Sequence, residues 1–190
     1  MNLVERVRQE VKKLNEEYIK NYDSFNFWES HIKYVVHEAL VLAERFGADK
    51  EIVELGALLH DIALISHVGT KADHHINGVK IADEILTKLG CPVEKKSSVL
   101  GCVLHHRNNR EVENLEEVCV ADADIIAHYD NIPMCFEVAF RFDKIKNMND
   151  REEWIAYFSK DFNDLSEETA KSFKPRYDKI MESLFPKLNI

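Results

Sequence analysis

The chain has 190 residues, 45% of them apolar, and its 34 acidic and 25 basic side chains give a net charge of −9. This composition is typical of a globular domain with a substantial core, and it excludes collagenous and disordered classes. The acidic balance, without a stripe of lysine and arginine, disfavours bulk nucleic acid and acidic membranes as partners.

Two further features bear on the cellular compartment. No stretch reaches the ~20 apolar residues of a membrane helix, and the charged N-terminal segment is unlike a signal peptide, so we expect a cytoplasmic protein. The four cysteines are widely spaced without a CxxC pair, which predicts neither a zinc knuckle nor a disulfide framework. We expect them to be small core residues.

Apolar residues recur at helical spacing, and we find no convincing strand-like alternation, so the predicted fold class is all-α. A first amphipathic stripe begins at Leu3. A second helix is predicted from about Phe27 to Phe46, because Gly47 suits the left-handed residue that closes a helix. Asp49 is the expected N-cap of a third helix, which carries the apolar segment LGALLHDIALI.

The later helices are set by similar signals. One is expected to run to Leu89 before Gly90, and Pro92 suits the first turn of the next. A helix containing VCVADADIIAHYD follows the polar segment RNNREVEN. Ser166 is predicted to cap the last helix, which Pro175 should kink or interrupt. We expect one domain over residues 1–190, with its chemistry at about 26–130 and a helical extension at about 131–190 whose aromatic residues form core.

Two helices carry acidic residues in apolar surroundings. Within residues 55–65 the only polar side chains are His60 and Asp61, and such a helix should be buried. A buried carboxylate must be paired, protonated or bound to a metal. Asp122 and Asp124 form a second polar island of this kind. A salt bridge or a capping hydrogen bond would satisfy either island alone, whereas the two together indicate a shared cation.

Histidines provide the remaining donors. All nine lie between His31 and His128. His31 begins an apolar helical stripe and should project toward the core, whereas His37 lies about 240° around the helix and is expected at the surface or in a second layer. His128 lies one turn after Asp124 and would share its face. His67, in a loop, is expected to be solvated.

Together His31, the pair His60–Asp61 and Asp124 resemble the H…HD…D signature of the HD superfamily of metal-dependent phosphohydrolases, over roughly residues 26–130. The resemblance implies an all-helical fold in which these four side chains converge on a divalent cation. Asp122 and Asp124 are about 200° apart on a helix, so only one can face the site. Apolar periodicity favours Asp122 on the core face, but the family pattern favours Asp124, which we prefer.

Binuclear members of this family commonly carry one further histidine before a G-x-x-x-A helix and another in the next apolar helix. His74 and His106 match these positions, with His75 and His105 as alternatives. Two metals about 3.5–4 Å apart, bridged by Asp61, can clamp the attacking and leaving oxygens of a phosphoryl displacement. With one metal, His74 and His106 could instead hold phosphate or shuttle protons. Capping or solvation at helix ends is the structural alternative.

The donor types suit Fe, Mn, Zn, Co or Ni. Arg107, with Arg110 assisting, could make a forked contact to phosphate, although both could equally be solvated loop cations. The candidate catalytic side chains are therefore His74, His106 and Arg107, of which the two histidines are also candidate metal ligands.

The favoured function is hydrolysis of a small phosphate ester, with a nucleotide as the leading substrate class. A di-iron oxygenase on the same ligands and a non-catalytic nucleotide-binding regulatory domain are the alternatives. A homodimer is plausible because the N-terminal stripe is apolar and the C-terminal helices are aromatic.

Overall fold

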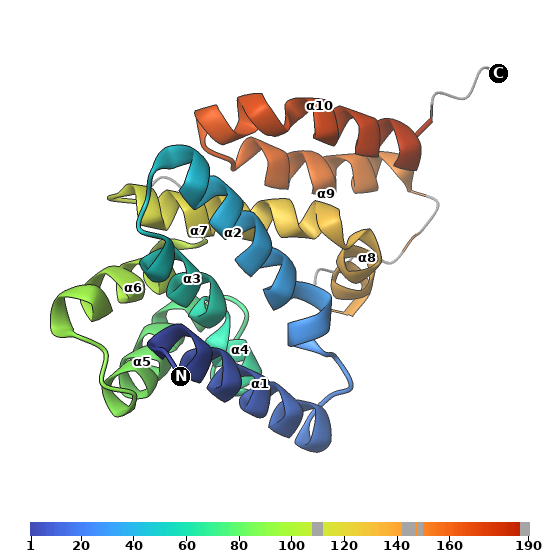
Figure 1. Cartoon of the computed structure of the whole chain (residues 1–190). Helices are drawn as coiled ribbons and strands as arrows, with labels where there is room; N and C mark the ends of the chain where they lie inside the picture. The colour runs from blue at the N-terminus through green and yellow to red at the C-terminus, as the bar shows by residue number, and fades with distance from the viewer. Residues whose placement is uncertain (108–111, 142–146, 148–149, 187–190) are drawn as a thin grey trace.

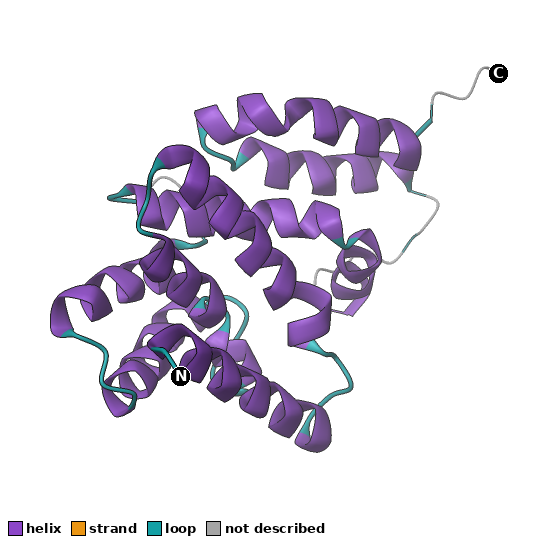
Figure 2. Cartoon of the chain, in the orientation of Figure 1, coloured by secondary structure: helices purple, strands orange, loops and turns teal. Residues whose placement is uncertain are grey.

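The computed structural model describes residues 1–107, 112–141, 147 and 150–186, which contain helices and no strand (Figure 2). The all-α prediction is confirmed. In chain order the elements are α1 Leu3–Asn21, the π-helical turn η1 Trp28–Ile32, α2 Lys33–Phe46, α3 Lys50–Leu59, α4 Ile62–Ile65, α5 His74–Lys88, α6 Val93–His105, α7 Leu115–Asp130, α8 Ile132–Arg141, α9 Arg151–Asn163 and α10 Glu167–Leu184. Across these residues, no helix combines the length and the apolar character that a membrane span requires.

Several helix ends lie where local chemistry predicts them. Gly47 closes α2 with a φ of 74°, in the left-handed region that glycine adopts without steric cost. The Asp49 side chain accepts hydrogen bonds from the amides of Glu51 and Ile52 and so caps α3. The predicted end of the second helix and the predicted start of the third are confirmed, whereas the first turn of the predicted second helix is π-helical.

The helices that position the candidate site pack at the centre of the fold. α2 packs against α3 and α7, and α3 also contacts α6, which packs with α5 (Figure 1). Gly56 permits the close approach of α3 to α6, because a Cβ at position 56 would lie 2.6 Å from the Cβ of Cys102. All four cysteines are buried and form no disulfide, as the sequence predicts.

The segment carrying the His60–Asp61 pair differs from its prediction. A single apolar helix was expected through residue 65, but the chain leaves helical geometry at this pair, where Asp61 has φ −100° and ψ 18°, and resumes as α4. On an unbroken helix, adjacent side chains point about 100° apart. The break therefore allows His60 and Asp61 to face the same site.

The C-terminal helices cover α7. α9 and α10 run side by side along the top of Figure 1. Trp154, Phe158 and Phe173 are buried, so these aromatic residues form core as predicted. Pro175 was predicted to kink or interrupt the last helix, and the interruption is wrong, because α10 continues through it. Arg176, the next residue, pairs with Glu38 and Asp130, and these ion pairs help to hold the following turn in place.

Candidate metal centre

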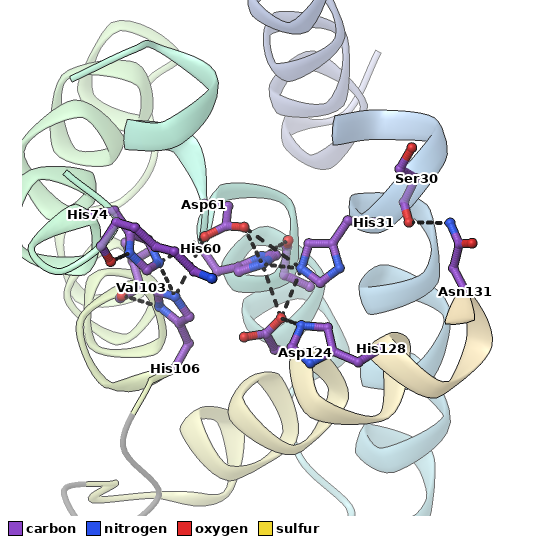
Figure 3. Close-up of polar contacts among 12 residues, drawn as sticks. Ser30, His31, His60, Asp61, His74, Val103, His106, Asp124, His128 and Asn131 are labelled. Atoms are coloured by element: carbon purple, nitrogen blue, oxygen red, sulfur yellow. Dashed lines mark hydrogen bonds and ion pairs between the residues drawn. The ribbon is translucent and has the colours of Figure 1, made fainter. Parts of the chain in front are cut away.

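A first group of donor atoms comes from three separate elements. His31 in η1, His60 at the end of α3 and Asp124 in α7 each present one ligand atom, and these atoms lie within 4.8 Å of one another. Nε2 of His31 is 2.9 Å from Oδ1 of Asp124 and 3.2 Å from Nε2 of His60. We call these residues the first triad (Figure 3).

A second triad lies beside the first. It consists of Asp61, His74 and His106. Nε2 of His74 is 2.9 Å from Oδ1 of Asp61 and 2.9 Å from Nε2 of His106. The other oxygen of Asp61 faces the first triad, at 3.5 Å from His60 and 3.8 Å from His31. Asp61 therefore has the placement of a bridging carboxylate (Figure 3).

Three of the four histidine rings are fixed by the same backbone contact. Nδ1–H of His60 donates to the carbonyl of Ala57 at 2.8 Å, and His74 and His106 donate in the same way to the carbonyls three residues before them, at 2.8 and 2.7 Å. A carbonyl only accepts, so the proton is on Nδ1 and Nε2 is the atom available to a ligand. Histidines that bind metals usually have such a partner on the other nitrogen.

The fourth ring, that of His31, is positioned through the backbone. Among the residues that the structure describes, Nδ1 of His31 has no hydrogen-bond partner. The turn that carries it is instead tied to the end of α7, because the Asn131 side-chain amide donates to the carbonyl of Ser30 at 2.7 Å (Figure 3). The hydrogen bond of a π-helical turn spans one more residue than that of an α-helix, and such turns are frequent at functional sites.

The donor set fits a divalent transition metal. Nitrogen lone pairs that face each other at 2.9 and 3.2 Å repel unless a cation or a proton lies between them. Imidazole and carboxylate together suit several transition metals, so the identity of the metal is open. Each triad offers three donors, and Asp61 offers an oxygen to each.

The electrostatics of the cluster agree with a site for positive charge. Burial opposes ionisation of Asp61 and Asp124, but the neighbouring histidines outweigh it and lower the pKa of both carboxyl groups. Burial would also lower the pKa of His60, yet Asp61 and Asp124 raise it to about 9. Burial and then His60 lower the pKa of His106 to about 3. The two carboxylates therefore favour positive charge at this site, and a metal would compete with a proton for Nε2 of His60.

The structure distinguishes the alternatives that the sequence left open. Asp124 faces the first triad, whereas Asp122 is fully buried elsewhere and accepts hydrogen bonds from the amide and the hydroxyl of Ser166. Apolar periodicity thus identified the more buried acid, and the family pattern identified the acid at the site. His106 belongs to the second triad, whereas His105 pairs with Glu117 at 2.8 Å. His74 rather than His75 is the other histidine of that triad.

Other predicted residues lie further from the triads. His37 is exposed, as predicted. His67 is exposed but stacks on Tyr22, with ring centroids 4.1 Å apart. Arg107 is exposed, and its Nη1 donates to the carbonyls of Lys71 and Ala72 at 3.1 and 2.8 Å. Arg110 lies outside the described residues.

All the triad residues except the fully buried His60 line a cavity of about 1210 Å³. The C-terminal helices complete it with residues that include Tyr157 and Asp161. Nδ1–H of His128 donates to Oδ2 of Asp161 at 2.9 Å. Burial would lower the pKa of His128, but Asp161 and then Asp124 raise it to about 9. Sequence periodicity placed His128 on the face of Asp124, whereas no sequence signal distinguished Asp161 from an ordinary surface carboxylate.

Comparison with known proteins places this site in a family. The sequence profile of the HD domain matches residues 28–128. Ribonuclease Y of Fusobacterium nucleatum is 31% identical over 98 residues, which are 52% of this chain and 18% of that protein. Ribonuclease Y of Deinococcus radiodurans is 30% identical over 99 residues, or 51% of this chain and 16% of that protein. The chain thus spans less than a fifth of the length of these relatives.

Solved structures share the fold over nearly the whole chain. A crystal structure of an HD-superfamily hydrolase from Bacillus thuringiensis has a TM-score of 0.70 at 20% identity, covering 95% of this chain and 92% of that one. YpgQ of Bacillus subtilis has a TM-score of 0.69 at 18% identity, covering 98% and 97%. Its complex with ADP has a TM-score of 0.60 at 17% identity, covering 98% and 100%. At these identities the likeness shows the fold alone.

Proposed function

This chain belongs to the HD domain family, and we propose that it is a metal-dependent phosphohydrolase acting on a small phosphate ester, with nucleotides as the favoured substrate class. The observation that carries the proposal is the pair of adjacent triads, with imidazole and carboxylate donors directed at common points and with the second oxygen of Asp61 facing the first triad. His31, His60 and Asp124 would hold one metal, and His74 and His106 would hold a second.

The metal supplies one part of the chemistry, since a bound divalent cation acidifies water to give a nucleophile near neutral pH and offsets the charge of a phosphoryl group. The protein fixes the positions of the side chains around the site. Backbone carbonyls orient His60, His74 and His106, and Asp61 presents one oxygen to each triad. The Arg107 guanidinium is held at the cavity wall by the carbonyls of Lys71 and Ala72, and its remaining N–H groups would bind phosphate oxygens.

The cavity supports a small-molecule substrate. Its volume of about 1210 Å³ accommodates a ligand of nucleotide size. Aromatic side chains of Tyr18, Phe25, Phe27 and Tyr157 line it beside the polar triads, which suits a substrate with an apolar or aromatic part. The solved complex of the structural relative YpgQ with ADP is consistent with a nucleotide. Ribonuclease Y acts on RNA by name, whereas a net charge of −9 disfavours a polynucleotide, whose phosphate backbone is bound mainly by lysine and arginine side chains.

Elemental analysis of the full chain purified without chelator, followed by a phosphatase screen over nucleotides with the metal found, tests the proposal. We expect bound transition metal and phosphate release by the wild type, and loss of both in Asp61→Ala. Asp178→Asn, at an exposed carboxylate on α10, is the matched control. Full activity of metal-depleted Asp61→Ala would refute the proposal.

Two other outcomes would favour the alternative functions. Oxygen consumption by the iron-loaded protein, without phosphate release, would favour a di-iron oxygenase. Tight nucleotide binding without turnover across several metals would favour a regulatory domain.

A further inference from the structure

We propose that an aromatic cluster in the cavity wall binds the base of a nucleotide substrate, with the rings of His67 and Phe27 in contact with the base. The cluster consists of Tyr18, Tyr22, Phe25, Phe27 and His67. The inference rests on the proposed function, because it takes the substrate to be a nucleotide whose phosphate group lies at the triads. Four of the five residues precede residues 28–128, so the match to the HD domain assigns them no role.

The rings of the cluster contact one another, and most of them line the cavity. Phe27 meets Tyr18 and Phe25 edge to face, with centroids 5.1 and 4.8 Å apart. His67 stacks on Tyr22 at 4.1 Å, with an interplanar angle of 16°. α1, which carries Tyr18, packs against α4, which His67 follows (Figure 1). The cavity is lined by Tyr18, Phe25, Phe27 and His67. This part of the wall thus offers aromatic rings, on which nucleobases stack.

The backbone of His67 favours a role for its side chain. Across the residues that the structure describes, His67 alone among non-glycine residues has a positive φ, of 55°. It closes α4 in a turn in which the Val68 amide donates to the carbonyl of Ala63 at 2.9 Å, and glycine is the usual residue at such a position. Histidine adopts this conformation at a steric cost, and residues in rare backbone conformations cluster at ligand-binding sites. Tyr22 covers one face of the exposed ring and so fixes its orientation in the cavity wall.

The cluster lies close enough to the triads for one small molecule to reach both. Phe27 already has helical dihedral angles, and it precedes His31 by four residues in one continuous helical segment. On the other side, the four residues of α4 separate Asp61 from the turn that carries His67. One helical turn rises about 5.4 Å, a span comparable to the ribose that separates the base of a nucleotide from its 5′-phosphate. A nucleotide with its phosphate group at the triads would therefore bring its base to the cluster.

The part of the wall that comes from α9 and the residues after it suits a base less well. It includes Tyr157, but also the charged side chains of Lys160, Asp161 and Asp164. Lys160 pairs with Asp164 at 3.2 Å, and both side chains are more than half exposed. A neutral aromatic base gains more from burial against uncharged rings than from a hydrated ion pair.

Binding of ribonucleosides to the full chain tests the subsite without metal or turnover, because a nucleoside lacks the phosphate group. We expect at least one of adenosine, guanosine, cytidine and uridine to bind in a calorimetric titration, and ribose not to bind. His67→Gly deletes the ring and keeps the turn, since glycine adopts this φ without steric cost. It should weaken nucleoside binding about tenfold, as should Phe27→Leu, which keeps an apolar side chain but loses the aromatic ring. His37→Gln, at an exposed histidine that does not line this cavity, is the matched control.

Steady-state kinetics of the metal-loaded chain give a second readout. The wild type should prefer the corresponding nucleoside monophosphate to ribose 5-phosphate in kcat/KM. Both variants should reduce this preference about tenfold, through KM rather than kcat, because the base binds without reacting.

Unchanged nucleoside affinity and unchanged preference in both variants would overturn the inference, as would a wild type that binds no nucleoside. An alkyl ester such as hexyl phosphate that binds more tightly than every nucleotide would assign the cluster to an alkyl chain and overturn it as well. A wild type that binds a nucleoside and loses this affinity in His67→Gly, but hydrolyses no phosphate ester, would overturn the proposed function and still support the subsite.

Discussion

The HD-matched region, residues 28–128, and the C-terminal helices α8–α10 use buried polar groups differently. In the first region, His60, His74 and His106 are buried with their Nε2 atoms directed at common points. In the second, the largest buried side chains are aromatic, and polar groups reach the first region through a few anchors, such as Ser166 on Asp122 and Asp161 on His128. Donor atoms whose lone pairs converge need a cation or a proton between them, whereas the anchoring side chains already have hydrogen-bond partners within the protein.

The largest expected effect comes from removing a donor in the first region. His60→Ala should lose the metal of the first triad and lower phosphatase activity by roughly a thousandfold or more, since a catalytic metal supplies several kcal/mol of transition-state stabilisation. Elemental analysis and initial rates measure this, with His37→Gln as the control. Wild-type rates in His60→Ala would remove the distinction between donors and anchors.

Acidification should have the second-largest effect, which is a weakening of metal binding. The pKa of His60 is raised to about 9, so its proton competes with the metal below that pH, whereas Asp61 and Asp124 have lowered pKa values and stay ionised. We expect metal affinity to fall up to about tenfold per pH unit, or roughly a hundredfold from pH 8 to pH 6. Calorimetric titration in two buffers measures both this and the released proton. Affinity that is constant over this range would contradict a donor role for His60.

Removing an anchor should affect stability rather than metal content. Asp122→Ala deletes the acceptor for the Ser166 amide and hydroxyl and should lower the free energy of unfolding by about 2–3 kcal/mol. Metal content should be unchanged, because Asp122 and Asp124 point about 200° apart around α7. Urea unfolding and elemental analysis on one preparation test this. Loss of metal without loss of stability would show that Asp122 serves the metal site rather than the contact with the C-terminal helices.

The smallest effect concerns packing within the first region. Gly56→Ala gains about 1 kcal/mol of helix propensity, but the new Cβ would lie 2.6 Å from that of Cys102. Overpacking of this kind costs about 1–3 kcal/mol, so we expect a net destabilisation of up to about 2 kcal/mol. Thermal unfolding measures it. A stabilised Gly56→Ala would mean that α3 and α6 can separate without cost.

Sequence reasoning performed best where burial and polarity conflict. His60, Asp61 and the pair Asp122 and Asp124 stand in apolar helices, and His31 begins an apolar stripe. The family pattern chose Asp124 over Asp122 and added His74 and His106. The structure brings the six predicted ligands together. Prediction was less successful where the backbone geometry determines which way a side chain points. The π-helical turn at His31 and the break after His60 follow from tertiary packing and have no signature in residue type.

The C-terminal contribution shows a different limit. Ser166 was correctly predicted to begin α10, but its hydroxyl bonds Asp122 and not its own helix. Asp161 lies on a helix with many charged residues, where nothing in the sequence marks one carboxylate as facing a cavity. Contacts between segments more than thirty residues apart require the fold before they can be identified.

The most direct test of the two-triad account is an anomalous difference map from crystals of the metal-loaded protein. The account predicts a peak at about 2.0–2.2 Å from Nε2 of His31 and His60 and from a carboxylate oxygen of Asp124, with Asp61 reaching the same peak or a second one at His74 and His106. Peaks only at surface residues, with both triads closed by hydrogen bonds among their own side chains, would contradict it.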